Sequence, residues 1–272
     1  MRAFLVGFLA LAACASDSGN KMPNGGGDDT GGTGGSNMGS NSGSDGTSDP
    51  SVRQDYDDVA TIVGANLNVA QLVAMQASVN LSYGRLPANF TEDVAGQLQT
   101  GTGSMTGTIA GMGATISYEC HDVNHVAIPC NGAEDHVRLV LKWTGAVTAA
   151  NMSMDSVNQK GVYYTRYINT MKPMFGGTGA DAFTSTLATG VYTVSYSEAS
   201  AHLLFDPANP LLPSGGTDNF TLTLHRTREG IPDRDFNVNA ALVVTGADAA
   251  TLTLDGTEVY NLTLSTGVAV HQ

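Results

Sequence analysis

The sequence is poor in basic residues. Of its 272 residues only 12 are Lys or Arg, against 25 that are Asp or Glu, so the formal net charge at pH 7 is -13. Nucleic acids and anionic lipid surfaces are bound mainly through a surplus of Lys and Arg. The sequence therefore argues against nucleic acid or anionic lipid as the main partner, and we expect the acidic surplus to serve solubility.

A long hydrophobic run is also missing. A membrane-spanning helix needs about 20 consecutive apolar residues, whereas the apolar run that follows the single cation Arg2 covers only residues 3–10. A charged start and a short hydrophobic centre are typical of a secretory signal peptide. The sequence therefore predicts export, with no transmembrane segment in the mature protein.

The apolar start of the chain ends in Leu11-Ala12-Ala13-Cys14. This tetrapeptide resembles the lipobox of bacterial lipoproteins. The resemblance implies that residues 1–13 are removed as a signal peptide and that the thiol of Cys14 carries a diacylglycerol group, because sulfur is a strong nucleophile. Two or more acyl chains anchor a protein stably. An ordinary cleaved signal peptide with an incidental cysteine is the alternative.

The residue after the lipobox cysteine bears on localisation. In lipoproteins of this kind an aspartate at that position retains the protein at the inner membrane, and here the position is occupied by Ala15. The resemblance therefore favours the outer membrane or the cell surface over the inner membrane.

Residues 15–50 contain no aromatic residue and no Leu, Ile or Val. Such a segment cannot bury enough apolar surface to offset its ordering entropy. We therefore expect residues 14–50, which start with the lipidated cysteine, to be a disordered linker, and a Gly-rich coil of this length spans about 33 Å. Its acids lack the spacing of a calcium-binding loop. Residues 51–272 are predicted to be a single β-rich domain.

Cysteine is scarce, with three in the whole chain. Beyond Cys14 there are only Cys120 and Cys130, which predict a disulfide because an exported protein meets oxidising surroundings. The alternative is a metal site that adds His121 and His125 to the two cysteines. Their spacing does not match common zinc modules, so the disulfide is favoured.

Between Asp55 and Tyr83, apolar residues recur with the 3.6-residue period of an amphipathic helix. Residues 64–68 interrupt the pattern, so two helices or one kinked helix are expected. Asn68 is a plausible N-cap for the second part and Gly84 a plausible stop. Three acids are expected to interact with the positive end of the helix dipole: Asp55, Asp57 and Asp58.

After Pro87 the apolar period changes to two, which is typical of strands. Ten or eleven strands from Ser104 onward predict a mainly β fold, an antiparallel sandwich or open barrel, with one or two N-terminal helices covering a face. The predicted strands are 105–109, 115–120, 137–143, 161–168, 183–187, 191–197, 201–205, 219–226, 235–244, 250–255 and 258–265.

The strand 137–143 illustrates the alternation. Trp143 shares a face with Val137, Leu139 and Leu141 and is predicted to lie in the core, whereas His136, Arg138 and Lys142 belong to the opposite face. Two polar stretches, 173–181 and 206–218, are expected to be loops, which is where a functional site is most easily placed.

Sequence motifs for catalysis are absent. There is no Gly-x-Ser-x-Gly elbow, no His-Glu-x-x-His and no P-loop. The polar stretch 226–239 is interpreted as an ion-paired connection, because its arginines neutralise the acids that a cation would need. His121, Asp122 and His125 could form a base with an orienting carboxylate, and Tyr163, Tyr164 and Tyr167 could stack on sugar rings or on bases; a structural role is favoured for both groups. We predict no catalytic residue, no metal and no cofactor.

These observations predict a lipid-anchored envelope or surface lipoprotein that acts by binding or structural interaction. Its partner would be an envelope protein, a polysaccharide or an apolar ligand, in addition to the membrane that holds the lipid anchor. One alternative is a carrier of an acyl chain or another apolar ligand, since a curved sheet covered by helices is similar in layout to carriers of that kind. A second alternative is an exported hydrolase without a recognisable motif.

Overall fold

The computed structural model describes residues 49–272, apart from residues 132, 150, 167–173, 199–201 and 207–208. The side chains of residues 70, 71, 74, 156–166, 209 and 210 also lie outside the description. The signal peptide, Cys14 and nearly all of the predicted linker therefore fall outside the described residues.

A continuous helical segment opens the described part of the chain. Helix α1 (Pro50–Asn66) leads into a π-helical turn (Leu67–Gln71) and then into α2 (Leu72–Ser82). The side chain of Asp49 caps the first turn, because it accepts a hydrogen bond of 2.9 Å from the N–H of Ser51. Pro50 fits the first helical position, where an N–H would have no partner within the helix. No helix among the described residues is long and apolar enough to cross a membrane.

The interruption predicted within residues 64–68 is a π-helical turn over residues 67–71. Asn68 does not cap a second helix: its Nδ2 donates to the carbonyl oxygens of Leu264 and Ser265, at 3.0 and 2.9 Å. The predicted N-cap is therefore wrong, because this amide makes a tertiary contact. Gly84 ends the helix as predicted, with a φ of 65° and an N–H that donates to the Leu81 carbonyl.

Thirteen strands follow the helices in the described residues, with a short 3₁₀ turn (Gln97–Gln99) before the second of them. Strands β1 to β13 cover, in order, Phe90–Glu92, Thr102–Ile109, Met112–His121, His136–Ala149, Met152–Arg166, Met174–Leu187, Gly190–Glu198, His202–Asp206, Asn209–Arg228, Ile231–Gly246, Ala249–Leu254, Glu258–Thr263 and Val268–His271.

The strands form one antiparallel sheet. Strands β7 and β8 both pair with β6 on one side and with β9 on the other. They are thus two parts of one strand path on either side of residues 199–201, and these four strands form a small closed ring of pairings. Every other strand pairs with its neighbours in the sequence. The predicted mainly β fold with helices on one face is confirmed, and the single sheet corresponds to its open-barrel form.

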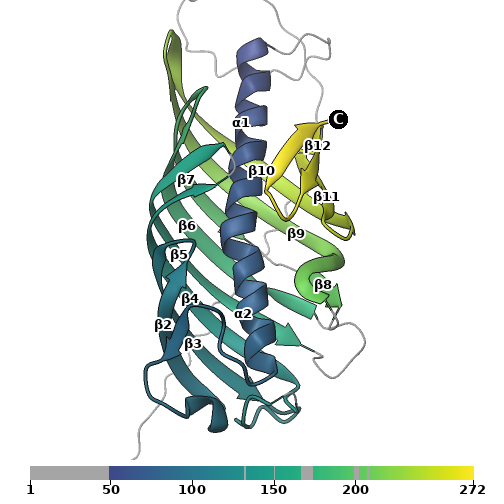
Figure 1. The fold of residues 1–272 in the computed structure, drawn as a ribbon. Coiled ribbons are helices and arrows are strands. Elements are labelled where there is room, and N and C mark those ends of the chain that lie inside the picture. The colour runs from purple at the N-terminus through teal and green to yellow at the C-terminus, as the bar shows by residue number, and fades with distance from the viewer. Residues whose placement is uncertain (1–48, 132, 150, 167–173, 199–201, 207–208) are drawn as a thin grey trace, which may run out of the picture. The chain divides into compact units, whose positions relative to one another are not determined.

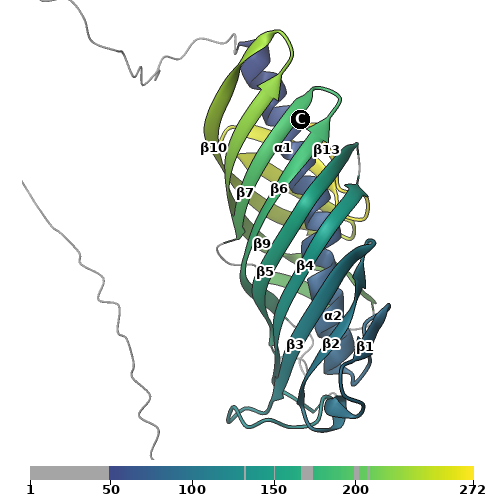
Figure 2. The same cartoon turned by 90° about the vertical axis from the view of Figure 1, so that its left-hand side faces the viewer.

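The helical segment lies along the concave side of the sheet (Figure 1), and Figure 2 presents the strands from another side. Helix α1 packs against β5 and β11 to β13, and α2 packs against β4, β5 and β9. Trp143 is 1% exposed, in the same core as Val137, Leu139 and Leu141, so its predicted place is confirmed. Gly64 is required where α1 meets the turn before β13, because a Cβ there would collide with the carbonyl oxygen of Gly267.

The two predicted loops are largely strands. Residues 174–181 belong to β6 and residues 209–218 belong to β9. Gly and Pro are poor strand formers, so the local pattern gave no strand signal there. The backbone of both segments nevertheless pairs with neighbouring strands, and Gly216 fits beside β8 only without a Cβ. The predicted strand at 161–168 begins earlier, at Met152, and its tyrosine side chains lie outside the described residues.

A buried ion-pair network holds α1 on the sheet. Arg226 donates through Nη1 to both carboxylate oxygens of Asp55, each at 2.9 Å. Arg228 bridges Asp55 at 3.0 Å and Asp58 at 2.8 Å. Arg234 reaches Asp55 at 3.1 Å. The side chains of Asp55 and Arg226 are only 3% and 4% exposed, so water does not screen this contact.

Hydroxyl groups complete the network. Tyr192 donates to Asp58 at 2.6 Å and accepts from Arg228 at 2.8 Å, and the hydroxyl of Thr189 donates to Asp58 at 2.7 Å. Burial, and then the neighbouring Asp58, raise the pKa of Tyr192, which therefore stays protonated as a donor.

The interpretation of residues 226–239 as ion-paired needs one correction. The arginines pair with acids of α1, about 170 residues away in sequence, whereas Asp235 of the same stretch pairs with His225 at 2.7 Å. The prediction that Asp55, Asp57 and Asp58 lie at the positive end of the helix dipole is also wrong, because α1 begins at Pro50 and has no acid in its first turn. Asp55 and Asp58 are buried instead.

We predict that Asp55→Asn destabilises the protein by about 3–5 kcal/mol, because it leaves buried guanidinium groups without their counter-charge. Urea unfolding of the full chain measures the effect. Asp235→Asn is the control: the Asp235 side chain is 85% exposed, and a surface change of this kind costs about 0.5 kcal/mol or less. Equal effects of the two substitutions would show that the network does not hold the helix.

Candidate functional site

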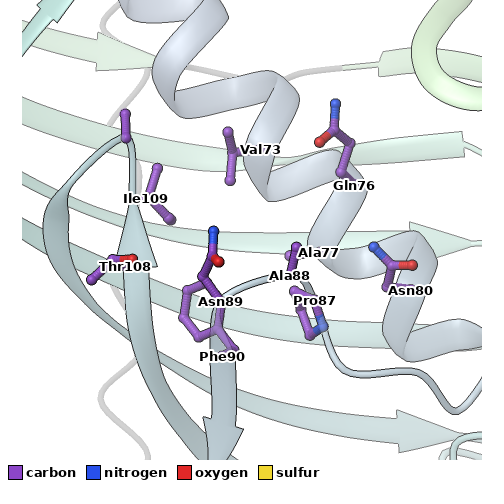
Figure 3. A pocket seen from close by; sticks show the side chains of 11 residues that line it. Val73, Gln76, Ala77, Asn80, Pro87, Ala88, Asn89, Phe90, Thr108 and Ile109 are labelled. Atoms are coloured by element: carbon purple, nitrogen blue, oxygen red, sulfur yellow. The ribbon is translucent and has the colours of Figure 1, made fainter.

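A pocket of about 200 Å³ opens between α2 and the neighbouring ends of β1 and β2 (Figure 3). We call it the α2–β2 pocket. Its apolar part comes from Val73 and Ala77 of α2, Pro87 before β1, Phe90 of β1 and Ile109 of β2. Its polar part comes from Gln76, Asn80, Asn89 and Thr108, and the lining residues that the structure describes include no acidic, basic or histidine side chain.

The backbone around Asn89 explains how this wall forms. Asn89 has a φ of 66°, a left-handed conformation that asparagine tolerates better than most residues. The N–H of Thr108 donates to the Asn89 carbonyl at 3.3 Å, so the segment before β1 lies directly against β2. A Cβ at Gly107 would collide with that carbonyl oxygen. The close approach of two backbones thus fixes the position of the Asn89 side chain.

The carboxamides of the pocket differ in their partners. Gln76 donates through Nε2 to the Leu211 carbonyl at 3.0 Å. The side-chain amides of Asn80 and Asn89 make no hydrogen bond to any residue that the structure describes. Figure 3 shows the Asn89 amide in the middle of the lining side chains, near Ile109 and Val73. The pocket therefore offers two uncommitted amides beside an apolar wall.

A second polar group lies inside the fold. Asp181, Glu198 and Asp218, on β6, β7 and β9, are all at most 5% exposed. Burial raises the pKa of Asp181 to about 7, although Asn66 donates to its carboxylate at 3.3 Å. Burial, and then the nearby Glu198, raise the pKa of Asp218 well above its usual range. Burial therefore favours the protonated forms of Asp181 and Asp218, but a substrate has no direct access to carboxyls this deeply buried.

Sequence reasoning missed this group. Each acid occupies an inward position in the alternation of its strand, as Glu198 does after Tyr192, Val194 and Tyr196. An acidic residue at a position that the alternation assigns to the core is the signal that could have identified this group from the sequence.

Three imidazole rings meet beside the disulfide. His121 and His136 are cross-strand partners on β3 and β4, with ring centroids 5.0 Å apart, and the ring of His125 also lies 5.0 Å from that of His136. Burial lowers the pKa of His136, against the opposing effect of Asp135, whose Oδ2 lies 3.3 Å from Nδ1. His136 was predicted on the solvent face, but the other two rings cover it and leave its side chain 8% exposed.

The predicted disulfide joins Cys120 to Cys130. The cysteines are therefore not available as metal ligands. Asp122 does not orient either histidine: its carboxylate accepts from the N–H groups of Asn124 and Val126, at 2.8 and 2.9 Å, and so shapes its own loop. Among the described residues, no three His, Cys, Asp or Glu side chains are grouped so that they could hold a metal ion.

Of the remaining predicted site residues, Cys14 lies outside the described part of the chain, as do the side chains of Tyr163, Tyr164 and Tyr167. Asn237 and Asn239 are exposed on the outer face of β10, as the alternation predicts.

No protein-family model, curated protein or solved structure matches this chain. The functional argument therefore depends on the residues themselves.

The raised pKa of Asp181 predicts a pH-dependent stability difference. Between pH 4 and about 7, the unfolded chain releases this proton while the folded chain keeps it, so the wild type loses stability as pH rises. The substitution Asp181→Asn removes that loss. Its free energy of unfolding at pH 8 should therefore exceed that of the wild type by at most about 4 kcal/mol, with little difference at pH 4.

Thermal unfolding at pH 4 and pH 8 tests this prediction. The control is Asp155→Asn, because Asp155 is an exposed acid on the adjacent strand β5. If the stability of Asp181→Asn changed between pH 4 and pH 8 by the same amount as that of the wild type, Asp181 would ionise normally in the fold.

Proposed function

We propose that this protein is a lipid-anchored lipoprotein of the cell envelope, at the outer membrane or cell surface, that acts by binding a partner. The anchor rests on Leu11-Ala12-Ala13-Cys14 after a short apolar run. The observation that carries the binding role is the α2–β2 pocket, whose described lining offers apolar surface and free amides but no ionisable side chain. A pocket of this composition suits recognition of a ligand.

The chemistry of the described residues supports binding over hydrolysis. General acid–base catalysis needs a titratable group within reach of the substrate. The acids with the largest shifts, Asp181 and Asp218, lie inside the core. The ionisable groups of the α1 network are held by one another, at distances of 2.8 to 3.1 Å.

A carrier of an acyl chain is the second candidate, favoured only by the layout of a curved sheet with covering helices. Such a carrier needs room between the helices and the sheet. In this protein the buried side chains of α1 and α2 pack there against those of the strands. The α2–β2 pocket, at about 200 Å³, is also below the range of about 300–1,000 Å³ that is usual for pockets of drug-sized ligands.

The anchor is tested by Cys14→Ser in the full chain. Without the thiol no diacylglycerol group can be attached, so we expect the protein to move from the membrane fraction to the soluble fraction. The matched control is the double substitution Cys120→Ser and Cys130→Ser, which removes the other two cysteines and should leave the protein with the membranes. Retention of Cys14→Ser in the membrane fraction contradicts the proposed anchor.

A further inference from the structure

We infer that the α2–β2 pocket binds one ring of a neutral saccharide. The inference rests on the proposed binding function and names the class of its ligand. It is argued from three properties of the pocket: its charge, its free hydrogen-bonding groups, and the size and position of its apolar wall.

The charge of the pocket selects an uncharged ligand. Among the described residues, no acidic, basic or histidine side chain lines it, although the chain as a whole carries a formal charge of -13. A charged group placed there would lose water without gaining a counter-ion, which is costly. Phosphates, carboxylates and amines are therefore disfavoured.

The free amides select a ligand with hydroxyl groups. The side chains of Asn80 and Asn89 each offer an N–H donor pair and a carbonyl acceptor, and neither is used by a described residue. An aliphatic chain or an apolar side chain of a protein partner would cover these amides and leave them without hydrogen bonds, at a cost of about 1–3 kcal/mol for each lost group. A hydroxyl both donates and accepts, so it can replace the water that it displaces.

The apolar wall of the pocket suits the face of a sugar ring that presents C–H groups. Val73, Ala77 and Ile109 lie beside the Asn89 amide, and Phe90 lies below it (Figure 3). The C–H face of a pyranose can pack on such side chains while its hydroxyls reach the amides. A volume of about 200 Å³ limits the site to a single ring. Because the pocket is open to solvent, the rest of an oligosaccharide can extend outward.

Titration of the full-length protein in detergent tests the inference. The probes are maltotetraose, cellotetraose and tetra-N-acetylchitotetraose, which are neutral oligosaccharides that differ in linkage or in ring substituent, and N-acetyl-leucine amide as an apolar probe. Binding is followed by calorimetry and by saturation-transfer NMR. We expect at least one oligosaccharide to bind and the apolar probe not to bind.

Three variants connect binding to this pocket. Asn80→Ala combined with Asn89→Ala should weaken oligosaccharide binding about tenfold or more, as expected for the loss of about 1.4 kcal/mol or more. Ala88→Trp should block the pocket, because Ala88 lines it and is exposed. Asn237→Ala is the control, since Asn237 is an exposed asparagine on the outer face of β10. Circular dichroism confirms that each variant is folded.

The outcomes separate the inference from the proposed function. Oligosaccharide binding that neither the Asn80→Ala and Asn89→Ala double variant nor Ala88→Trp weakens overturns the inference. Binding of the apolar probe alone, blocked by Ala88→Trp, also overturns it but keeps a binding role for the pocket. If no probe binds at a concentration of about 10 mM, the dissociation constant is weaker than this site should have. Both the saccharide inference and the binding role of the pocket are then wrong. The lipid anchor is tested separately by Cys14→Ser.

Discussion

The position of helix α1 depends on the ion pairs that the carboxylate of Asp55 makes. This carboxylate accepts hydrogen bonds from Arg226, Arg228 and Arg234, at distances between 2.9 and 3.1 Å, although it is almost fully buried. Buried charges are tolerated only when they are paired, and an unpaired partner is strongly unfavourable. The hairpin of β9 and β10 and the start of α1 can therefore pack only in the arrangement that brings these groups together.

The rest of the architecture follows from a helical segment that contacts the sheet at several points along its length. Below the ion pairs, Gly64 lets α1 approach the turn before β13, and Asn68 binds the carbonyls after β12. Helix α2 then continues along the sheet to the region of β1 and β2. The α2–β2 pocket lies between α2 and the strand ends there (Figure 3), so the same contacts that hold the helix also define the candidate site.

The polar groups of the fold divide by their surroundings. The ion pairs around Asp55 and the buried acids around Asp181 lie in the core, where low solvent access makes their pairing or protonation a matter of stability. The amides of Asn80 and Asn89 in the α2–β2 pocket make no hydrogen bond to a described residue. The ion-paired groups around Asp55 stabilise the fold, whereas the free amides of Asn80 and Asn89 are available to a ligand. This difference is the physical basis for assigning recognition to the pocket.

The sequence alone determined the features that depend on local periodicity. It predicted a mainly antiparallel β fold behind N-terminal helices, the buried face of Trp143, the helix stop at Gly84 and the pairing of Cys120 with Cys130. Only the tertiary structure decided which groups meet across long separations. Asp55, the ion-pair partner of Arg226, lies 171 residues away, and the glycine-rich part of β6 is a strand because its neighbours supply the backbone partners. Local patterns record side-chain preference, whereas charge pairing and backbone pairing depend on the fold that brings distant segments together.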